Sequence, residues 1–180
     1  MLSLFSVAVS VGLSLSGSVL ESLEAEDPFA QEIPVDSGPV DPGPVDPGPV
    51  SLEVRTTAYT HTESDHLRYK NKTASGTILK YGKVRSAAAD WSVFPLGTKF
   101  RIKGEPAVYQ VDDYGSALVG TKTIDLYMPN RSMMNRWGVR HVEIELIEEG
   151  CLAKSLKILK PRSRYGAFIR RMVRSIEAQT

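Results

Sequence analysis

The sequence predicts an all-β fold, a small six-stranded β-barrel followed by a short C-terminal amphipathic helix. Three observations favour this fold class. Short β-rich runs alternate with turn residues between residues 51 and 150. No stretch of 51–128 keeps an apolar helical period for three turns, whereas the last residues do follow a helical period. We favour a barrel over a sandwich because closure removes unpaired strand edges.

The predicted strands are runs rich in β-branched, aromatic or small residues, each bounded by Gly, Pro or Asp. They are 54–59, 84–89, 99–102, 107–111, 123–127 and 139–147. The last run alternates between apolar and polar residues, as a half-buried strand does. Turn signals such as Pro95-Leu96-Gly97 and Tyr114-Gly115 separate the runs, and 130–137 fits one short helix.

The C-terminal residues predict an amphipathic helix. One face carries apolar side chains and the other carries arginines. The apolar set is Phe168, Ile169, Met172, Val173 and Ile176, and the basic set is Arg170, Arg171 and Arg174. The first interpretation is a helix packed on the barrel, and the second is a basic helix that touches anionic envelope polymers or lipid headgroups.

Charge is distributed unevenly along the chain, although the formal net charge is only +1. Residues 1–50 hold eight acidic and no basic side chains, 51–150 hold 14 basic and 12 acidic ones, and 151–180 hold eight basic and one acidic. The overall balance argues against a nucleic-acid partner. The single cysteine, Cys151, excludes an intrachain disulfide and a CxxC zinc site.

Composition divides the chain into four parts. Residues 1–20 are uncharged and resemble a signal segment, with an N-terminal anchor as the alternative. Residues 21–52 form an acidic Pro/Gly-rich spacer with a Pro-Val-Asp repeat, 53–150 the barrel domain, and 151–180 a basic extension. We therefore expect an exported protein of the periplasm or cell envelope, either secreted or anchored, and a monomer.

Three aspartates are candidates for chemistry because of their positions in the predicted strands. Asp90 follows a run of small residues, Asp113 ends a strand before Tyr114-Gly115, and Asp125 lies inside an apolar strand, where a charge is costly unless satisfied. Alternation places Asp113 on the face of Tyr109 and Val111, with Asp112 on the other face as a solvated or structural neighbour. The turn at 115–120 could bring Asp113 and Asp125 together.

Clustered carboxylates resist joint ionisation, so the pKa of one of them rises. A carboxyl that stays protonated near neutral pH can act as a general acid, which cleavage of a glycosidic bond requires. The alternative is that each aspartate caps a turn or accepts a backbone N–H. Spacing alone leaves both interpretations open.

The ordered set of short motifs from residue 56 to residue 147 resembles the three-aspartate (3D) domain. This domain occurs in membrane-bound lytic murein transglycosylase A and in stationary-phase-survival or resuscitation-factor-like muralytic proteins. The matching pieces are Thr57-Ala58-Tyr59, Thr73-Ala74-Ser75-Gly76, Ala87-Ala88-Ala89-Asp90, Phe94-Pro95-Leu96-Gly97-Thr98, Asp113-Tyr114-Gly115, Gly120, Ile124-Asp125-Leu126-Tyr127 and Trp137-Gly138-Val139. Some of the pieces also resemble rare lipoprotein A and expansin-like domains.

The resemblance implies a double-psi β-barrel that cleaves peptidoglycan glycan strands and forms a 1,6-anhydromuramyl product. Asp125 matches the catalytic acid, and Asp113 and Asp90 would orient it and tune its pKa. Thr57, Tyr59, Thr73 and Ser75 match substrate-groove positions. The resemblance implies no cofactor and no metal.

Two other functions stay open. A non-catalytic module that binds or loosens wall glycan, like the expansins, would also suit the basic tail. A hydrolytic glycosidase on the same barrel would need a second carboxylate to activate water, and Asp113 is its candidate. The loop cluster of His61, Glu63, Asp65 and His66 could hold a metal, but its spacing matches no site that we can name.

Overall fold

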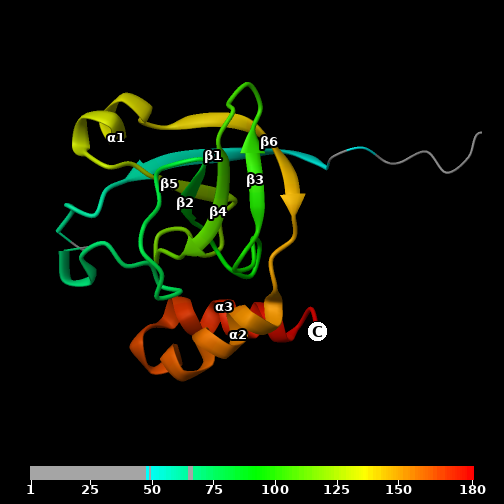
Figure 1. Cartoon of the computed structure of the whole chain (residues 1–180). Helices are drawn as coiled ribbons and strands as arrows, with labels where there is room; N and C mark the ends of the chain where they lie inside the picture. The colour runs from blue at the N-terminus through cyan, green and yellow to red at the C-terminus, as the bar shows by residue number, and fades with distance from the viewer. Residues whose placement is uncertain (1–47, 49, 65–66) are drawn as a thin grey trace, which may run out of the picture. The chain divides into compact units, whose positions relative to one another are not determined.

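The structure is a computed structural model that describes residue 48 and residues 50–64 and 67–180. Its six strands are β1 (Ser51–Tyr59), β2 (Val84–Ala88), β3 (Lys99–Ile102), β4 (Val108–Asp113), β5 (Thr123–Tyr127) and β6 (Arg140–Glu148). They close into a barrel in the order β1-β5-β2-β4-β3-β6 (Figure 1). Two neighbouring pairs, β1 with β5 and β2 with β4, are parallel, and the other pairs are antiparallel. The prediction of a six-stranded barrel is confirmed.

The described residues also contain several helices, so the fold is mostly β and not all-β. They are the 3-10 helices η1 (Leu67–Tyr69) and η2 (Lys160–Tyr165), and the α-helices α1 (Arg131–Trp137), α2 (Leu152–Leu159) and α3 (Ala167–Glu177). The prediction of a single C-terminal helix missed α2. Its eight residues complete little more than two turns, too few for a clear helical period.

Apolar side chains that alternate along the strands fill the inside of the barrel. Phe100 on β3 and Tyr109 on β4 lie on paired strands, and their rings stack with centroids 5.4 Å apart. Val111, Ala87 and Leu126 form one row across β4, β2 and β5, and all three are fully buried. Successive residues of a strand point to opposite faces, so Ala88, which follows Ala87, and Asp125, which precedes Leu126, point to the outer face of the barrel, where the candidate site lies.

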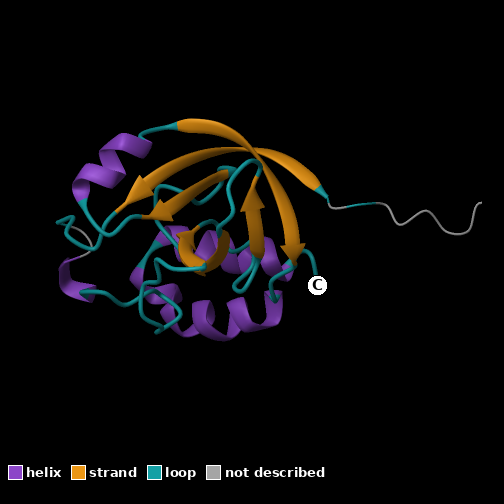
Figure 2. Ribbon diagram, turned by 45° about the horizontal axis from the view of Figure 1, so that its top comes forward, coloured by secondary structure: helices purple, strands orange, loops and turns teal. Residues whose placement is uncertain are grey.

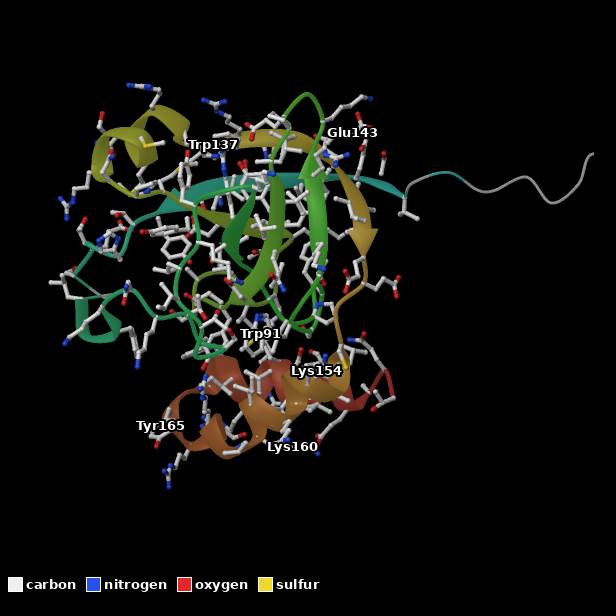
Figure 3. The ribbon with its side chains drawn as sticks, viewed as in Figure 1. Trp91, Trp137, Glu143, Lys154, Lys160 and Tyr165 are labelled. Carbon is white, nitrogen blue, oxygen red and sulfur yellow. The ribbon has the colours of Figure 1, made fainter. Side chains whose placement is uncertain are left out.

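The helices α2 and α3 cover one end of the barrel (Figures 1 and 2). The predicted apolar face of α3 packs inward, because Ile169, Met172 and Ile176 are buried in the same core cluster as the strand residues. Trp91 is fully buried and lies between the barrel and these helices, whereas Lys154 and Lys160 point to solvent (Figure 3). The interpretation that the terminal helix packs on the barrel is confirmed.

The predicted signal-like segment 1–20 and almost all of the spacer 21–52 lie outside the described residues, so the four-part division stays a prediction. The first described strand begins at Ser51. Among the described residues, none of the helices has the length and apolar character needed to cross a membrane.

Candidate functional site

Four residues form a row across four neighbouring strands on the outer face of the barrel. Thr57 on β1 pairs with Asp125 on β5, Asp125 pairs with Ala88 on β2, and Ala88 pairs with Asp113 on β4. The row lines a groove of about 260 Å³. Because Ala88 carries only a methyl group, the two carboxylates stand on either side of a low floor. Their strands are two sheet spacings apart, which puts their backbones about 9–10 Å from each other.

A β-bulge at Asp112 turns Asp113 to the outer face. Ala87 pairs with Val111, but the next residue, Ala88, pairs with Asp113, so Asp112 is the extra residue. Strict alternation had placed Asp113 on the face of Val111, and that prediction is wrong because the bulge shifts the register by one residue. Asp112 is 2% exposed and structural, since one of its oxygens accepts from Ser86 Oγ at 2.8 Å.

Asp113 is buried and fixed by donors on three segments. Its Oδ1 accepts from the backbone N–H of Ala74 at 3.0 Å and of Tyr114 at 2.8 Å, and its Oδ2 lies 3.5 Å from the hydroxyl of Tyr59. Burial raises the pKa of Asp113 from its ordinary value of 3.8 to about 6, and the backbone hydrogen bonds oppose this shift. Asp113 can therefore hold a proton close to neutral pH.

Asp125 is half-buried and therefore reachable from the groove. The hydroxyl of Thr57 donates to Asp125 Oδ1 at 2.7 Å, across the parallel β1/β5 pair. Burial and the nearby Asp113 charge raise the pKa of Tyr59, which keeps its hydroxyl a neutral donor. The groove thus presents one reachable carboxyl and one buried carboxyl, each held by a hydroxyl from β1.

Asp90 is separate from this row. It is 2% exposed, and its Oδ1 accepts from the backbone N–H and the hydroxyl of Ser92 at 2.9 and 2.6 Å. Its Oδ2 accepts from the backbone N–H of Gly120 at 2.7 Å, which ties the loop before β5 to the turn after β2. The three predicted aspartates are therefore not one cluster. Asp113 and Asp125 line the groove, and Asp90 anchors the loop that joins them in sequence.

Thr73 and Ser75 hold the loop that supplies Ala74. Their hydroxyls lie 2.8 Å apart, and both contact the hydroxyl of Thr77, at 3.0 and 3.1 Å. The backbone N–H of Ser75 donates to the carbonyl of Asp112 at 3.1 Å. Of the predicted substrate-binding residues, Thr57 and Tyr59 line the groove, whereas Thr73 and Ser75 are not part of its lining and flank Ala74, which donates to Asp113.

Residues 85–148 match the sequence model of the 3D domain. This part of the chain is a 3D domain. It runs from β2 to β6 and contains Asp90, Asp113 and Asp125, as the ordered motifs had indicated. Thr57 and Tyr59 on β1 precede the matched region, and the helices α2 and α3 follow it.

The chain is also similar to a protein that is linked to the cell wall. Over 97 residues the chain is 35% identical to YabE of Bacillus subtilis (strain 168), a protein to which a cell wall shaping role is attributed. The aligned region covers 53% of this chain and 23% of that relative. The chain thus spans less than a quarter of the length of the curated relative it matches.

The groove of the 3D domain contains residues that the sequence had not singled out for it. Glu63 and Leu118 line the groove, from the loops after β1 and before β5. From the sequence, we considered Glu63 only as a metal ligand. Its position four residues after Tyr59, in the loop that leaves the end of β1, was a sign that it lies near the same groove. His61 contacts the hydroxyl of Tyr127 at 2.9 Å. The other two members of that loop cluster, at 65 and 66, lie outside the described residues.

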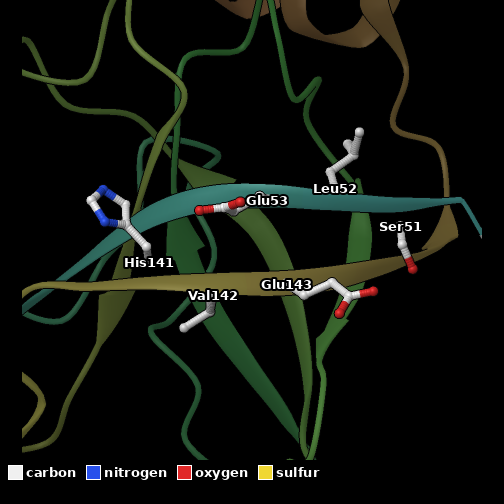
Figure 4. A pocket seen from close by; sticks show the side chains of 6 residues that line it. All are labelled: Ser51, Leu52, Glu53, His141, Val142 and Glu143. Atoms are coloured by element: carbon white, nitrogen blue, oxygen red, sulfur yellow. The ribbon is translucent and has the colours of Figure 1, made fainter.

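A second depression lies on β1 and β6, away from the aspartates (Figure 4). It is lined by Glu53, His141 and Glu143 together with three neighbours on the same strands. His141 is exposed, and Glu143 pairs with Lys103 at 2.7 Å. The depression is shallow and belongs to the solvated surface of the barrel.

The burial of Asp113 predicts a specific dependence of stability on pH. Its pKa is about 6 in the folded chain and about 4 in an unfolded one, so the folded state holds this proton to a higher pH. The free energy of unfolding should therefore fall as the pH rises from about 4 to about 6, by roughly 3 kcal/mol from this group, and then level off. The pKa of Asp112 is also raised by burial and contributes with the same sign.

Denaturant unfolding at pH 4, 5, 6 and 7 tests this effect, with Asp113→Asn beside the unchanged chain. Asn keeps the size of the side chain and an oxygen for the two backbone donors, but it does not titrate. We expect a shallower decline of stability in the variant, while Asp112 retains its own share. Equal pH slopes for the two proteins would show that Asp113 titrates normally in the folded chain.

Proposed function

We propose that this chain cleaves peptidoglycan glycan strands by the lytic-transglycosylase reaction, with Asp125 as the general acid and base. The observation that carries the proposal is the reachable Asp125 carboxyl, held by Thr57 in a groove whose far side is the buried Asp113. The 3D domain match and the cell wall role attributed to YabE support the substrate class.

In the proposed reaction, protonated Asp125 donates its proton to the oxygen between N-acetylmuramic acid and N-acetylglucosamine, and the bond from this oxygen to muramyl C1 breaks. The Asp125 carboxylate then takes the proton of the muramyl 6-hydroxyl, and the oxygen of this hydroxyl bonds to C1. The 1,6-anhydro ring closes, Asp125 regains its proton, and no water is consumed. The family resemblance implies that Asp113, which faces Asp125 in the same groove, orients it and tunes its pKa.

The remaining expectations belong to the same proposal. The two parallel strand pairs in a closed six-stranded barrel support the double-psi topology that the family resemblance implies. Thr57 and Tyr59 bind the sugar in the groove, and Thr73 and Ser75 support it. Asp90 orients Asp125 indirectly, through the loop that it anchors at Gly120. The chain works outside the cytoplasm as an exported monomer.

Mass spectrometry of the products that the full chain releases from purified peptidoglycan tests the proposal. We expect muropeptides that are one water lighter than hydrolysis products, because ring closure replaces the attack of water. Products with a reducing end would instead assign hydrolysis, with Asp113 as the second carboxylate. A chain that pellets with the glycan and releases nothing soluble would not be a transglycosylase.

The second candidate is a non-catalytic module that binds wall glycan. The exposed basic side chains of the C-terminal helices favour it, because Lys154, Lys157, Arg170 and Arg174 all face solvent in a region with one acidic residue. Cell walls carry anionic polymers that such a surface attracts. This candidate predicts glycan pelleting that is equal for the unchanged chain and for Asp125→Asn.

A further inference from the structure

The side chain of Arg162, on η2, reaches from the C-terminal helices to the candidate site. Its Nη1 donates to the carbonyl of Ala74 at 2.8 Å and to the hydroxyl of Tyr114 at 3.4 Å. Arg162 is half-buried, whereas Arg164 on the same short helix is exposed and donates to its neighbour Tyr165, at 2.7 Å. Arg162 therefore contacts residues of the candidate site, whereas Arg164 contacts the residue next to it.

The two residues that Arg162 contacts are the same two whose backbone N–H groups donate to Asp113 Oδ1. The backbone N–H groups of Ala74 and Tyr114 donate to Asp113 Oδ1 at 3.0 and 2.8 Å. Ala74 belongs to a loop of small polar residues. Its backbone N–H reaches Asp113 only while that loop keeps its position. A donor placed on its carbonyl fixes the peptide planes around it, and with them the direction of the N–H that meets the carboxyl.

The packing of the helices on the barrel gives Arg162 a rigid base. Leu159, just before η2, and Ile169, just after it, are buried in the core. The ring of Tyr114 lies between Trp91 and Phe168 of α3, with centroids 5.0 and 6.2 Å away. Side chains from the helices thus fix both the ring and the hydroxyl of Tyr114.

A second arginine of the same helices contacts the same set of loops. The guanidinium of Arg171 lies against Gly120, in the space that a Cβ at this position would take. Gly120 has a φ of +82°, a conformation that favours glycine, and it donates its N–H to Asp90. The loop carrying Ala74 is therefore hydrogen-bonded, and the loop before β5 is contacted, by arginines beyond the matched region 85–148.

We propose that Arg162 is a positioning residue of this site, which makes the C-terminal helices a working part of the 3D domain of this chain. Its guanidinium holds Ala74 and Tyr114 so that their N–H groups stay on Asp113. The inference rests on the proposed function for its effect on catalysis, but its structural part stands without it.

The test compares three variants of the full chain with the unchanged one: Arg162→Met, Arg162→Lys and Arg164→Met. NMR titration of the Asp113 carboxyl, assigned by the loss of its signal in Asp113→Asn, is the first readout. The charged or titratable groups that face Asp113 are Asp112 on its own strand, Tyr59 on β1, and Asp125 and Glu63 across the groove. All of these stay in place in the three variants. Because Arg162→Met also removes a positive charge near Asp113, the amide proton shifts of Ala74 and Tyr114 are followed in the same titration, and a change in those shifts reports on the donors.

We expect Arg162→Met to raise the titration midpoint of Asp113, because weaker N–H donors stabilise the charged carboxylate less. The rate of glycan release should fall by roughly tenfold to a hundredfold with little change in KM, as small misplacements do. Arg162→Lys should restore much of both properties, and Arg164→Met should match the unchanged chain.

An unchanged Asp113 midpoint in a folded Arg162→Met protein would overturn the proposal, and so would an equal effect of Arg164→Met. If Arg162→Met fails to fold, the midpoint and rate of Arg162→Lys against Arg164→Met decide the question. A chain that releases no product at all would sink the proposed function, while the titration would still show whether Arg162 positions the donors of Asp113.

Discussion

Replacing Asp125 by Asn is expected to lower the release of anhydromuropeptides by about a hundredfold to ten-thousandfold, the range that general acid–base catalysis contributes. Asn has the same size as Asp, and its oxygen can still accept the hydroxyl of Thr57, which lies at 2.7 Å in the unchanged chain. It cannot give a proton to the leaving oxygen or take one from the 6-hydroxyl. The measurement is the initial rate of product release from purified peptidoglycan.

The interpretation of this result depends on the fold staying intact. Asp125 is half-buried on the outer face, so the variant should unfold at the same denaturant concentration as the unchanged chain. Glu149→Gln is a matched control, because it removes an exposed carboxylate outside the groove. Undiminished release by Asp125→Asn, with its fold shown to be intact, would remove Asp125 from the catalytic role.

Replacing Trp91 by Ala is expected to cost about 3–5 kcal/mol of unfolding free energy, the usual range for truncating a buried large aromatic. Trp91 is fully buried between the barrel and the C-terminal helices. Its ring meets that of Tyr114 edge-on at 5.0 Å, and its Nε1 donates to the carbonyl of Asp113 at 2.8 Å. The change would leave a cavity beneath the site and remove one of two donors to this carbonyl, which also accepts from the backbone N–H of Ala89 at 3.2 Å.

Trp91→Phe separates the two contributions, because it keeps most of the ring packing and removes only the N–H donor. We expect it to destabilise the chain by about 1 kcal/mol from the hydrogen bond, plus a smaller packing loss. Denaturant unfolding of both variants, followed by far-UV circular dichroism, measures the difference. If Trp91→Ala lost less unfolding free energy than Trp91→Phe, the packing of the helices would not depend on this contact.

The strands were predictable because each follows from a local pattern. The limits of β3 and β5 are those expected, and the other four strands were found with shifted ends. The ends moved where pairing outweighs local pattern. β1 starts three residues early because Ser51, Leu52 and Glu53 pair with β6, although all three are exposed and carry no apolar alternation.

The site was predictable only in part, for reasons that sequence alone does not reveal. Asp113 and Asp125 could be found from their residue type and place, but the face of Asp113 depends on a bulge, which changes pairing with no local sign. Asp90 follows the end of a strand as Asp113 nearly does, but its carboxylate accepts hydrogen bonds from Ser92 and Gly120 in loops, which the sequence pattern does not show. Arg162 contacts Ala74 from 88 positions away, which no spacing argument reaches.

The order of strands in the barrel determines when the chain can fold. β1 comes first in the sequence, yet its partners are β5 and β6, and Thr57 and Asp125 are 68 positions apart. A nascent chain that ends before Arg140 would leave one side of β1 without a neighbour. Contacts between distant residues slow folding, because a large loop must close before any pairing compensates for its lost entropy. The barrel is therefore expected to fold late and as a unit, only after synthesis has passed β6.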